Sequence, residues 1–307
     1  MEIIHVPYKE IDRKKWDSCI RNASYGSIYV TSMYADTMGG TWDALIAGNY
    51  EILMPLYYRK KAGIKYLYQP AFLPQTGVFS KGTISPEIIK AFIDKAFSIF
   101  SFGEISLSYP VAVSFSKKNM KVKERNNFVV DLSSAYKKVY GNYAPGFVKS
   151  LNRLKKLSLQ YTKGDDVKEI ISLFKKLYLE KIEGLSNADV NKFSSLCIGL
   201  QEKNDIVIRK AYSASGDLFC AALLFRYGNR LYNMISCITP EGKKAEANYF
   251  LYDKIMEEFS GKDLVLDLEG SDIKGIADFY LKMGPRNEPA FFIRYNNLPG
   301  IIRLLKK

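Results

Sequence analysis

Residues 251–268, LYDKIMEEFSGKDLVLDL, align without a gap with residues 92–109, FIDKAFSIFSFGEISLSY. The alignment places Leu266 on Leu107, and an Asp-Lys pair falls at the same position in both stretches. Each stretch begins with apolar residues at helical spacing and ends with a short apolar run, which predicts a helix that leads into a strand. A repeat of this kind indicates that the chain contains one structural unit twice.

The residues around the two stretches predict the same order of elements in each half: a strand, two helices, three strands, a helix and a strand. In the first half, the expected strands are 3–6, 42–47, 51–58, 64–69, 103–108 and 127–131, and the expected helices are 10–22, 27–37 and 86–100. In the second half, the expected strands are 158–163, 205–213, 218–227, 230–237, 263–268 and 290–295, and the expected helices are 165–181, 187–202, 247–259 and 273–283.

Three consecutive strands joined by short turns predict antiparallel pairing, because parallel neighbours need a longer crossover. Helices around such a sheet give a mixed α/β fold. We therefore expect two tandem units, each with a mostly antiparallel central sheet flanked by helices. The boundary is expected at 143/144, so that residues 1–143 form the first unit and residues 144–307 the second, which begins with a basic junction helix at 144–157.

The composition excludes several classes of site. The chain has 307 residues and a single histidine, His5, which excludes a multi-histidine metal site and an HExxH zinc site. Four cysteines lie far apart with no CxxC pair, so we expect reduced, buried thiols in a cytoplasmic protein and no metal. No stretch has the roughly 18 uninterrupted apolar residues of a membrane span, and the N-terminal residues predict no signal peptide.

The formal net charge of +13 is concentrated in one segment, because residues 132–164 contain seven basic residues and no acidic residue. Within this segment, Lys149, Arg153 and Lys156 lie four and three residues apart and form one stripe on a predicted helix. Such a stripe can bind the phosphates of a nucleotide, a coenzyme or an RNA backbone. The alternative is a solvated helix face that keeps the protein soluble.

The order of elements resembles the GNAT acyltransferase fold, and two such units in tandem resemble the Fem-type peptidyltransferases and the FemAB-like acetyltransferases. Four stretches carry this resemblance. DLEGS at 267–271 is similar to the family's D-F-x-G-S segment, and FYLKMG at 279–284 is similar to its F-[KY]-x-x-[FM]-G segment. The stretch 147–161 is similar to the basic segment that leads into the second domain, and QPAFLPQTGVFS at 69–80 resembles the loop after the third sheet strand.

The resemblance implies where the substrates bind. Acyl-CoA enzymes of this fold carry [RQ]-x-x-G-x-[GA] before a helix, where backbone N–H groups hold the pyrophosphate. The corresponding stretch here is GKKAEAN, in which Gly242 replaces the Arg or Gln and two lysines supply positive charge. The implied donor-binding residues are Gly242, Lys243, Lys244, Ala245, Ala247 and Asn248, of which Asn248 is alternatively a helix cap. The candidate substrate-binding residues are Gln75, Gly77, Lys149, Arg153 and Lys156.

Three residues of the second half are candidates for catalysis. Tyr280 lies four residues before Gly284, as in the Y-x-x-x-G of GNAT enzymes, whose tyrosine can protonate the departing thiolate. A phenol with a pKa of about 10 is a suitable acid for a thiolate with a pKa of about 8.5, and the alternative is a core tyrosine. Asp267 and Glu269 alternate with leucines and project from one side of the strand end. Either is a candidate general base or anchor for a cationic acceptor, and the alternative is a cap for the next helix.

These observations favour an acyltransferase that moves an acyl group, with acetyl as the first choice, from acyl-CoA to an amine of a cell-envelope or polysaccharide precursor. The second unit would bind the donor and carry the catalytic groups, and the first would bind the acceptor or serve as a scaffold, with the site in a cleft between them. Two alternatives stay open: a Fem-type peptidyltransferase that uses aminoacyl-tRNA, and a catalytically inactive tandem binding module. Residues 165–202 predict two ordinary helices and no coiled-coil arm, which favours acyl-CoA over tRNA.

Overall fold

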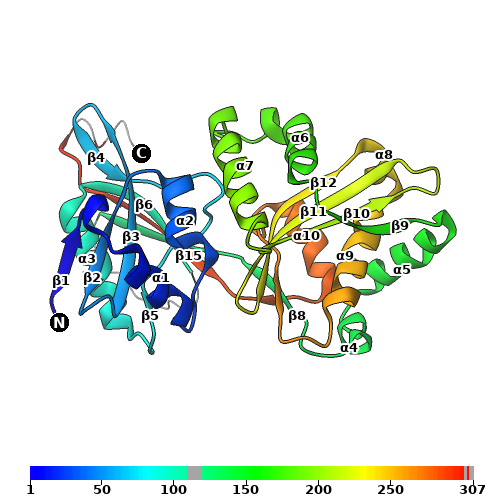
Figure 1. Ribbon diagram of the computed structural model, residues 1–307, viewed down its shortest axis with the longest axis horizontal. Helices are drawn as coiled ribbons and strands as arrows, with labels where there is room; N and C mark the ends of the chain where they lie inside the picture. The colour runs from blue at the N-terminus through cyan, green and yellow to red at the C-terminus, as the bar shows by residue number, and fades with distance from the viewer. Residues whose placement is uncertain (109–118, 301–302, 304–307) are drawn as a thin grey trace. The chain divides into compact units, whose positions relative to one another are not determined.

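The computed structural model describes residues 1–108, 119–300 and 303, which divide into two compact units. Unit 1 consists of Met1–Arg125 and Pro289–Lys307, and unit 2 consists of Asn126–Glu288. Each unit contains one mixed sheet with helices packed against it (Figure 1). The predicted mixed α/β class with two sheet-based units is therefore confirmed; residue 109, the last of the first aligned stretch, lies outside the described residues.

Unit 1 has the strand order β1-β2-β3-β4-β6-β15-β7, with the short β5 paired to β3. All neighbours pair antiparallel except β4 and β6, which are parallel. Its strands are β1 (Ile3–Val6), β2 (Trp42–Ala47), β3 (Ile52–Lys61), β4 (Ile64–Leu67), β5 (Phe79–Ser80), β6 (Phe102–Leu107), β7 (Met120–Arg125) and β15 (Ala290–Asn296). Its helices are α1 (Arg13–Asn22), α2 (Ser32–Tyr34) and α3 (Pro86–Ile99).

Alternation along β2 explains how helices cover both faces of the unit 1 sheet. Leu45 belongs to the buried cluster that contains Phe92 of α3. Trp42 points the other way and packs on Trp16 of α1, with ring centroids 4.8 Å apart. The predicted helix 27–37 is divided into a 3-10 helix (Ile28–Val30) and a short α-helix that continues as a π-helix to Gly39; it ends before Gly40, whose φ of +71° suits glycine.

Unit 2 has the strand order β14-β8-β13-β12-β11-β10-β9, in which only β12 and β13 are parallel. Its strands are β8 (Phe128–Asp131), β9 (Gln160–Gly164), β10 (Ile206–Tyr212), β11 (Leu218–Tyr227), β12 (Arg230–Ile238), β13 (Val265–Asp267) and β14 (Arg286–Asn287). Its helices are α4 (Tyr136–Gly141), α5 (Pro145–Leu154), α6 (Val167–Tyr178), α7 (Asn187–Gln201), α8 (Pro240–Ala245), α9 (Ala247–Phe259) and α10 (Lys274–Tyr280).

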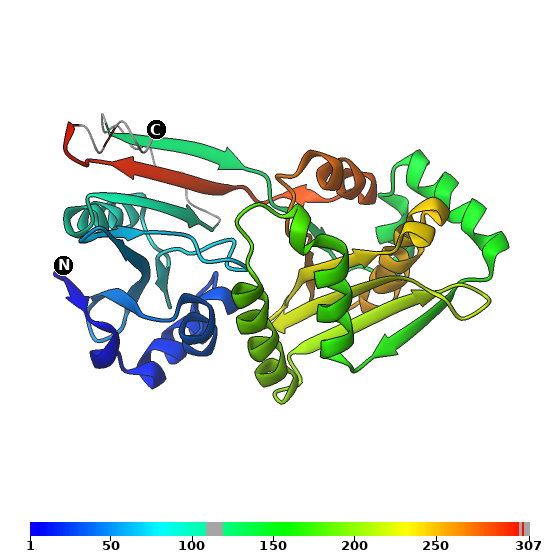
Figure 2. The same cartoon turned by 90° about the horizontal axis from the view of Figure 1, so that it is seen from above.

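The continuous apolar run of β11 is buried on both faces, since helices lie on each side of the sheet (Figures 1 and 2). Ala222 and Leu224 share a buried cluster with residues of α9 and α5. The next residue, Phe225, stacks on Phe193 of α7 with ring centroids 5.5 Å apart. Helices α4, α5, α9 and α10 therefore cover one face, and α7 covers the other.

The last strand of each half lies in the sheet of the other unit. We expected strand 127–131 to close the first half and strand 290–295 to close the second. Instead, β8 lies between β13 and β14 in unit 2, and β15 lies between β6 and β7 in unit 1. The exchange buries the apolar face of β15, where Ile293 pairs with Ile105 on one side and Val122 on the other.

This exchange moves the boundary. The chain passes from unit 1 to unit 2 at 125/126 and returns at 288/289, rather than crossing once at 143/144. The predicted junction helix 144–157 corresponds to α5 and lies wholly inside unit 2.

The surroundings of His5 and of the four cysteines indicate that these residues serve the fold. His5 contacts Asp43 across the β1–β2 pair, with 3.0 Å between Nε2 and Oδ2. All four cysteines are buried free thiols that form no disulfide, as expected. Within the part of the chain that the structure describes, no three His, Cys, Asp or Glu side chains gather as metal ligands do. Over the same residues, none of the helices has both the length and the apolar character needed to cross a membrane.

Candidate functional site

The parallel strands β12 and β13 lie side by side for a short distance and then part. Their pairing begins at Arg230 and Val265 and ends at Tyr232 and Asp267. β12 continues to Ile238, and among the described residues no strand pairs with it on that side. A strand that parts from its neighbour inside a sheet presents backbone N–H and C=O groups that an extended ligand can bind.

A β-bulge lies at the same point of β12. Leu223 of β11 pairs with Ile235, whereas Leu224 pairs with Asn233, so that Met234 is an extra residue in β12. A bulge bends the strand and increases its twist, which turns the end of β12 away from β13. The N–H of Ile238, at the far end of the parting, donates a hydrogen bond of 3.2 Å to the Tyr178 hydroxyl of α6.

Three polar side chains meet where the two strands part. The Asn233 side-chain nitrogen donates to the Tyr252 hydroxyl at 2.6 Å and to the Tyr280 hydroxyl at 2.9 Å. All three residues are buried, and within the described residues Asn233 Oδ1 has no hydrogen-bond partner. An unpaired buried carbonyl costs about 1–3 kcal/mol, so this oxygen marks a position where a ligand N–H or O–H would be stabilised.

The surroundings of Tyr280 keep its hydroxyl protonated. Burial raises the pKa of Tyr280 well above its usual value, and the neighbouring Tyr252 and the negative charge of Glu269 raise it further. Burial also raises the pKa of Tyr252 to about 12. Both phenols therefore remain neutral hydrogen-bond donors at physiological pH.

Asp267 and Glu269, which the sequence places on one side of the strand, have different surroundings. Asp267 is 2% exposed, and its Oδ2 accepts from Arg230 Nη1 at 2.6 Å. Arg230 also donates to Glu288 at 2.6 Å. Burial raises the pKa of Asp267 while the Arg230 charge opposes that change. Asp267 therefore belongs to a buried ion-pair network that joins β12, β13 and the residue after β14, whereas Glu269 is only half-buried.

Asp267 binds Arg230 and Asn127 rather than capping the next helix, which was the alternative for both carboxylates. Helix α10 begins at Lys274 without a side-chain cap, its N-cap position being Ile273. Ser271 instead accepts from the Phe128 N–H and donates to the Leu268 carbonyl, both at 2.9 Å. Ser271 thus fixes the turn after β13 against β8.

The stretch expected to hold a pyrophosphate, 242–248, is mostly helical. Gly242 lies in α8 and packs against β11, where a Cβ atom would come within 2.2 Å of the Phe219 carbonyl oxygen. Its N–H is already bound by the Thr239 hydroxyl at 3.0 Å. Lys243 and Lys244 are exposed, whereas Ala245 and Ala247 are covered to different degrees. Asn248 is the second residue of α9 and is not its cap.

A carboxylate lies at the N-terminus of α9. Glu246 occupies the N-cap position with a φ of +60°, and its side chain accepts a hydrogen bond from Arg153 of α5. An acidic group at a helix N-terminus interacts favourably with the helix dipole, as a phosphate would. Arg153 is thereby paired, whereas Lys149 and Lys156 of the predicted stripe are exposed.

In unit 1, the chain itself fills the position that is open in unit 2. β4 and β6 are parallel only at Leu67 and Gly103, and the loop 69–80 then lies along β6. The Thr76 N–H donates to the Ser106 carbonyl at 2.6 Å, and the Ser108 N–H donates to the Thr76 carbonyl at 2.8 Å. Gln75 is half-buried and Gly77 is buried, on either side of this bridge.

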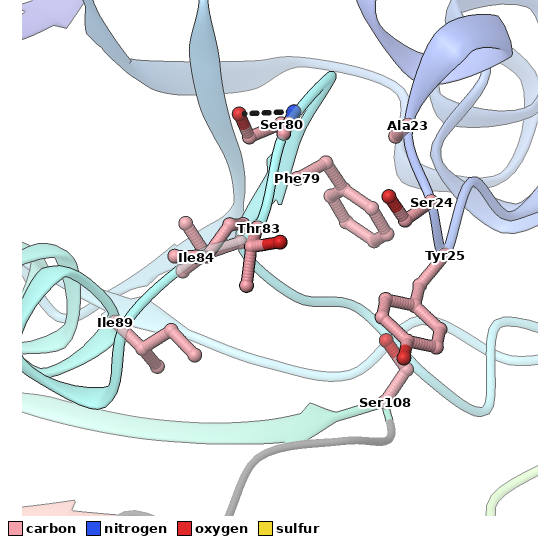
Figure 3. A pocket seen from close by; sticks show the side chains of 11 residues that line it. Ala23, Ser24, Tyr25, Phe79, Ser80, Thr83, Ile84, Ile89 and Ser108 are labelled. Carbon is pink, nitrogen blue, oxygen red and sulfur yellow. Dashed lines mark hydrogen bonds between the residues drawn. The ribbon is translucent and has the colours of Figure 1, made fainter.

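A pocket of about 170 Å³ lies beside this loop in unit 1 (Figure 3). Phe79 stands in its middle, and the Tyr25 and Ser108 side chains point toward one another. Neither Gln75 nor Gly77 lines the pocket; the loop contributes Val78, Phe79 and Ser80. This pocket therefore contains neither of the unit 1 candidates for substrate binding.

Sequence reasoning missed Asn233 and Tyr252. The detectable sign was an asparagine inside the apolar strand RLYNMISCI, where a buried amide is unfavourable unless its hydrogen bonds are needed. Tyr252 gave no comparable sign, because a tyrosine on an amphipathic helix is an ordinary core residue.

Comparisons at the level of sequence find no match, neither among protein-family models nor among curated proteins. Solved structures do match. FemX has a TM-score of 0.66 at 13% identity, over 100% of both chains. A conserved protein of unknown function from Bacteroides thetaiotaomicron has a TM-score of 0.63 at 9% identity, over 95% of this chain and 99% of the other. The C-terminal domain (DUF2156) of a putative lysylphosphatidylglycerol synthetase from Agrobacterium fabrum has a TM-score of 0.58 at 13% identity, over 96% of this chain and 94% of the other.

These similarities extend over nearly the full length of the chain. They confirm the fold that the sequence resembles, a mixed α/β fold with two GNAT-like units. At this level of identity the likeness concerns the fold, and the chemistry must be argued from the residues of this chain.

Proposed function

We propose that this protein is an acyltransferase that moves an acyl group, with acetyl as the first choice, from acyl-CoA to an amine of a cell-envelope or polysaccharide precursor. The observation that carries the proposal is the parting of β12 from β13 with Asn233 and Tyr280 at its closed end. The tandem GNAT-like fold supports it, since the three similar structures share that architecture.

The open edge of β12 suits an extended donor that carries amide groups. Such a chain can pair with the backbone from Asn233 to Cys237, before the Ile238 N–H that Tyr178 already binds, as an added strand would. The free Asn233 Oδ1 can accept a hydrogen bond from one donor N–H. The thioester would then lie near the closed end, beside the Tyr280 hydroxyl.

The reaction needs few groups. The acceptor amine attacks the thioester carbon, a C–N bond forms, and the carbonyl oxygen takes the negative charge while backbone N–H groups of β12 stabilise it. The C–S bond then breaks, and the thiolate receives a proton from the Tyr280 hydroxyl. Glu269 accepts the proton that the amine loses, and that proton balances the one given by Tyr280. Asp267 keeps Arg230 in place and so maintains the pairing of β12 and β13.

One observation favours a different donor. The Glu246 carboxylate lies at the α9 N-terminus, where the pyrophosphate of acyl-CoA binds in enzymes of the resembled family, and Arg153 already neutralises it. An aminoacyl-tRNA donor needs no pyrophosphate at that position. Its leaving group is a ribose hydroxyl, and the same tyrosine would protonate it. This is the second candidate, a Fem-type peptidyltransferase.

A thermal-shift titration with acetyl-CoA tests the donor. Binding to the folded state raises the melting temperature in proportion to RT ln(1 + [L]/Kd). We expect a rise with acetyl-CoA that exceeds the rise with free acetyl phosphate. No shift at millimolar acetyl-CoA would overturn the acyl-CoA donor, and aminoacyl-tRNA would then be assayed. With the donor known, a screen of amino sugars, amino acids and peptidoglycan precursors identifies the acceptor.

A further inference from the structure

A second cavity lies within unit 2, among α4, α5 and α9, and contains none of the residues proposed above for acyl transfer. Its volume is about 630 Å³, inside the range of about 300–1,000 Å³ that small-molecule sites occupy. Figure 1 shows these three helices grouped on one side of the unit 2 sheet. The side chains that line the cavity indicate which ligand it fits.

Aromatic and aliphatic side chains form the walls. Tyr136 and Tyr140 of α4 contribute one wall, with their ring centroids 5.9 Å apart. Leu151 and Leu154 of α5 and Phe250 of α9 contribute the remainder. Walls of this kind favour a flat ring, because stacking on an aromatic face removes apolar area from water on both sides.

A buried carboxylate lies among these walls. Asp253 of α9 is 8% exposed, and its Oδ1 accepts from the Tyr136 hydroxyl at 2.6 Å and the Tyr143 hydroxyl at 3.1 Å. None of the described residues donates a hydrogen bond to Oδ2 of this carboxylate. Burial raises the pKa of Asp253, which adds to the benefit of a further donor. The site is therefore able to accept one N–H or O–H group of a ligand.

This buried acid is not a general feature of the repeated unit. In the first half, the aligned residue is Asp94, which forms a surface pair with Lys90 at 2.8 Å on α3. Unit 1 thus folds with the same residue in solvent. The burial of Asp253 beside two tyrosines is specific to unit 2, which points to a role at the cavity.

Lysines line the cavity together with the apolar walls. Lys137 and Lys155 come from the acid-free segment 132–164, and Lys254 comes from α9. Lys254 is paired with Glu257 at 2.6 Å, and Lys155 donates to Asn152 at 3.0 Å. Lys137 makes no hydrogen bond or ion pair with the described residues. Lys137 and Lys155 are therefore both able to bind a phosphate group.

We infer that this cavity binds a nucleoside phosphate, with the base against Tyr140 and the apolar walls, a base N–H or sugar hydroxyl on Asp253, and the phosphate on Lys137 and Lys155. A bare anion does not explain the apolar walls or the buried carboxylate. A simple amine does not explain the lysines. The inference is independent of the proposed acyl transfer.

Isothermal titration calorimetry on the full chain tests the inference, with AMP, GMP, CMP and UMP as probes and with adenosine and inorganic phosphate as partial probes. We expect at least one mononucleotide to bind more tightly than its nucleoside and than phosphate alone. Each of Lys137→Ala and Lys155→Ala is expected to weaken that binding by about tenfold, as for loss of a charge-assisted hydrogen bond.

Two other lysines of unit 2 provide controls. Lys138, adjacent to Lys137, and Lys168 of α6 are exposed and absent from the cavity lining, so Lys138→Ala and Lys168→Ala should keep wild-type affinity within about twofold. Asp253→Asn, checked for folding by its melting temperature, should weaken the binding of the mononucleotide and leave the binding of inorganic phosphate unchanged. The inference is overturned if no mononucleotide binds at millimolar concentration, or if the control lysines matter as much as the lining lysines. It is also overturned if acetyl-CoA displaces the nucleotide, because the binding would then belong to the donor site.

Discussion

The side-chain nitrogen of Asn233 lies 2.9 Å from the Tyr280 hydroxyl and donates a hydrogen bond to it. The bond joins the bulged part of β12 to the last residue of α10, which are far apart in the sequence. Because the amide donates to Tyr280, the phenol proton is free to point to Tyr252 or to a ligand. The same amide also donates to Tyr252, so Tyr280 is one of two buried phenols that Asn233 holds at this point.

Tyr280→Phe tests the role of this hydroxyl. We expect kcat to fall by about 10²-fold, the usual contribution of a general acid, with little change in the KM for the donor. Tyr249→Phe is a matched control, because its hydroxyl also has a side-chain partner, Lys282, but is not one of the two phenols that Asn233 binds. Steady-state kinetics on both variants decide the matter. Wild-type kcat in Tyr280→Phe would remove the proposed role.

The two carboxylates at the end of β13, Asp267 and Glu269, should respond differently to loss of charge. Asp267→Asn removes the charged partner of Arg230 Nη1 in a buried network. Breaking such an ion pair typically lowers the free energy of unfolding by about 3–5 kcal/mol. Glu269→Gln should lower kcat and leave the melting temperature nearly unchanged, since Glu269 is half-buried. Thermal unfolding and kinetics of the two variants separate these effects. Equal destabilisation by both would contradict our assignment.

Two glycines at the α10 end of unit 2 give opposite stability predictions. Gly284 has a φ of +68°, and a Cβ there would meet the Asn142 carbonyl oxygen at 2.3 Å. Gly284→Ala should therefore destabilise unit 2 by more than about 1 kcal/mol. Gly275 lies within α10 with open space around it, so Gly275→Ala should stabilise by up to about 1 kcal/mol. Urea unfolding of the pair measures both.

Acid unfolding should depend on Glu258. Burial alone would raise its pKa, but hydrogen bonds from Arg209 and Tyr161 lower the pKa from the usual 4.5 to about 2. Because the folded state holds the ionised form, the stabilisation is complete above pH 4.5 and is lost as the pH falls toward 2.

Glu258→Gln removes that contribution. The variant should melt at a lower temperature than the wild type at pH 6, and the difference should shrink as the pH falls below 4.5. Melting curves across this range check the expectation, with the exposed Glu257 changed to Gln as control. A constant difference between variant and wild type at every pH would show that the shape of the side chain matters and not its charge.

Local patterns predicted most elements of the fold. Strands such as 42–47 and 218–227 and the helix 247–259 have the expected bounds, because alternation and helical spacing are properties of each segment alone. The exchange of β8 and β15 was not predictable in this way. Which strand pairs with which depends on distant residues, and nothing inside IRYN or FVVD identifies the partner sheet. β7 was missed because four of its six residues, in MKVKER, are charged.

The site was predictable only where a motif marks it. Tyr280 and Glu269 came from short motifs, and their roles at the site stay predictions. The polar contacts of Asn233 depend on a bulge in β12, which no local sequence pattern predicts. The stretch 242–248 looked like an open loop because of its glycine and small residues. In the fold that glycine instead permits close packing of α8 on β11.

The position of β15 also governs the order in which the chain is able to fold as it is made. Asn126–Glu288 is continuous, so unit 2 has all of its strands once residue 288 has left the ribosome. Unit 1 begins earlier but receives the strand between β6 and β7 only when Ala290–Asn296 is synthesised, and among the described residues β7 pairs with no other strand. The half of the protein whose translation begins first therefore receives its last strand only after the whole of unit 2 has been translated.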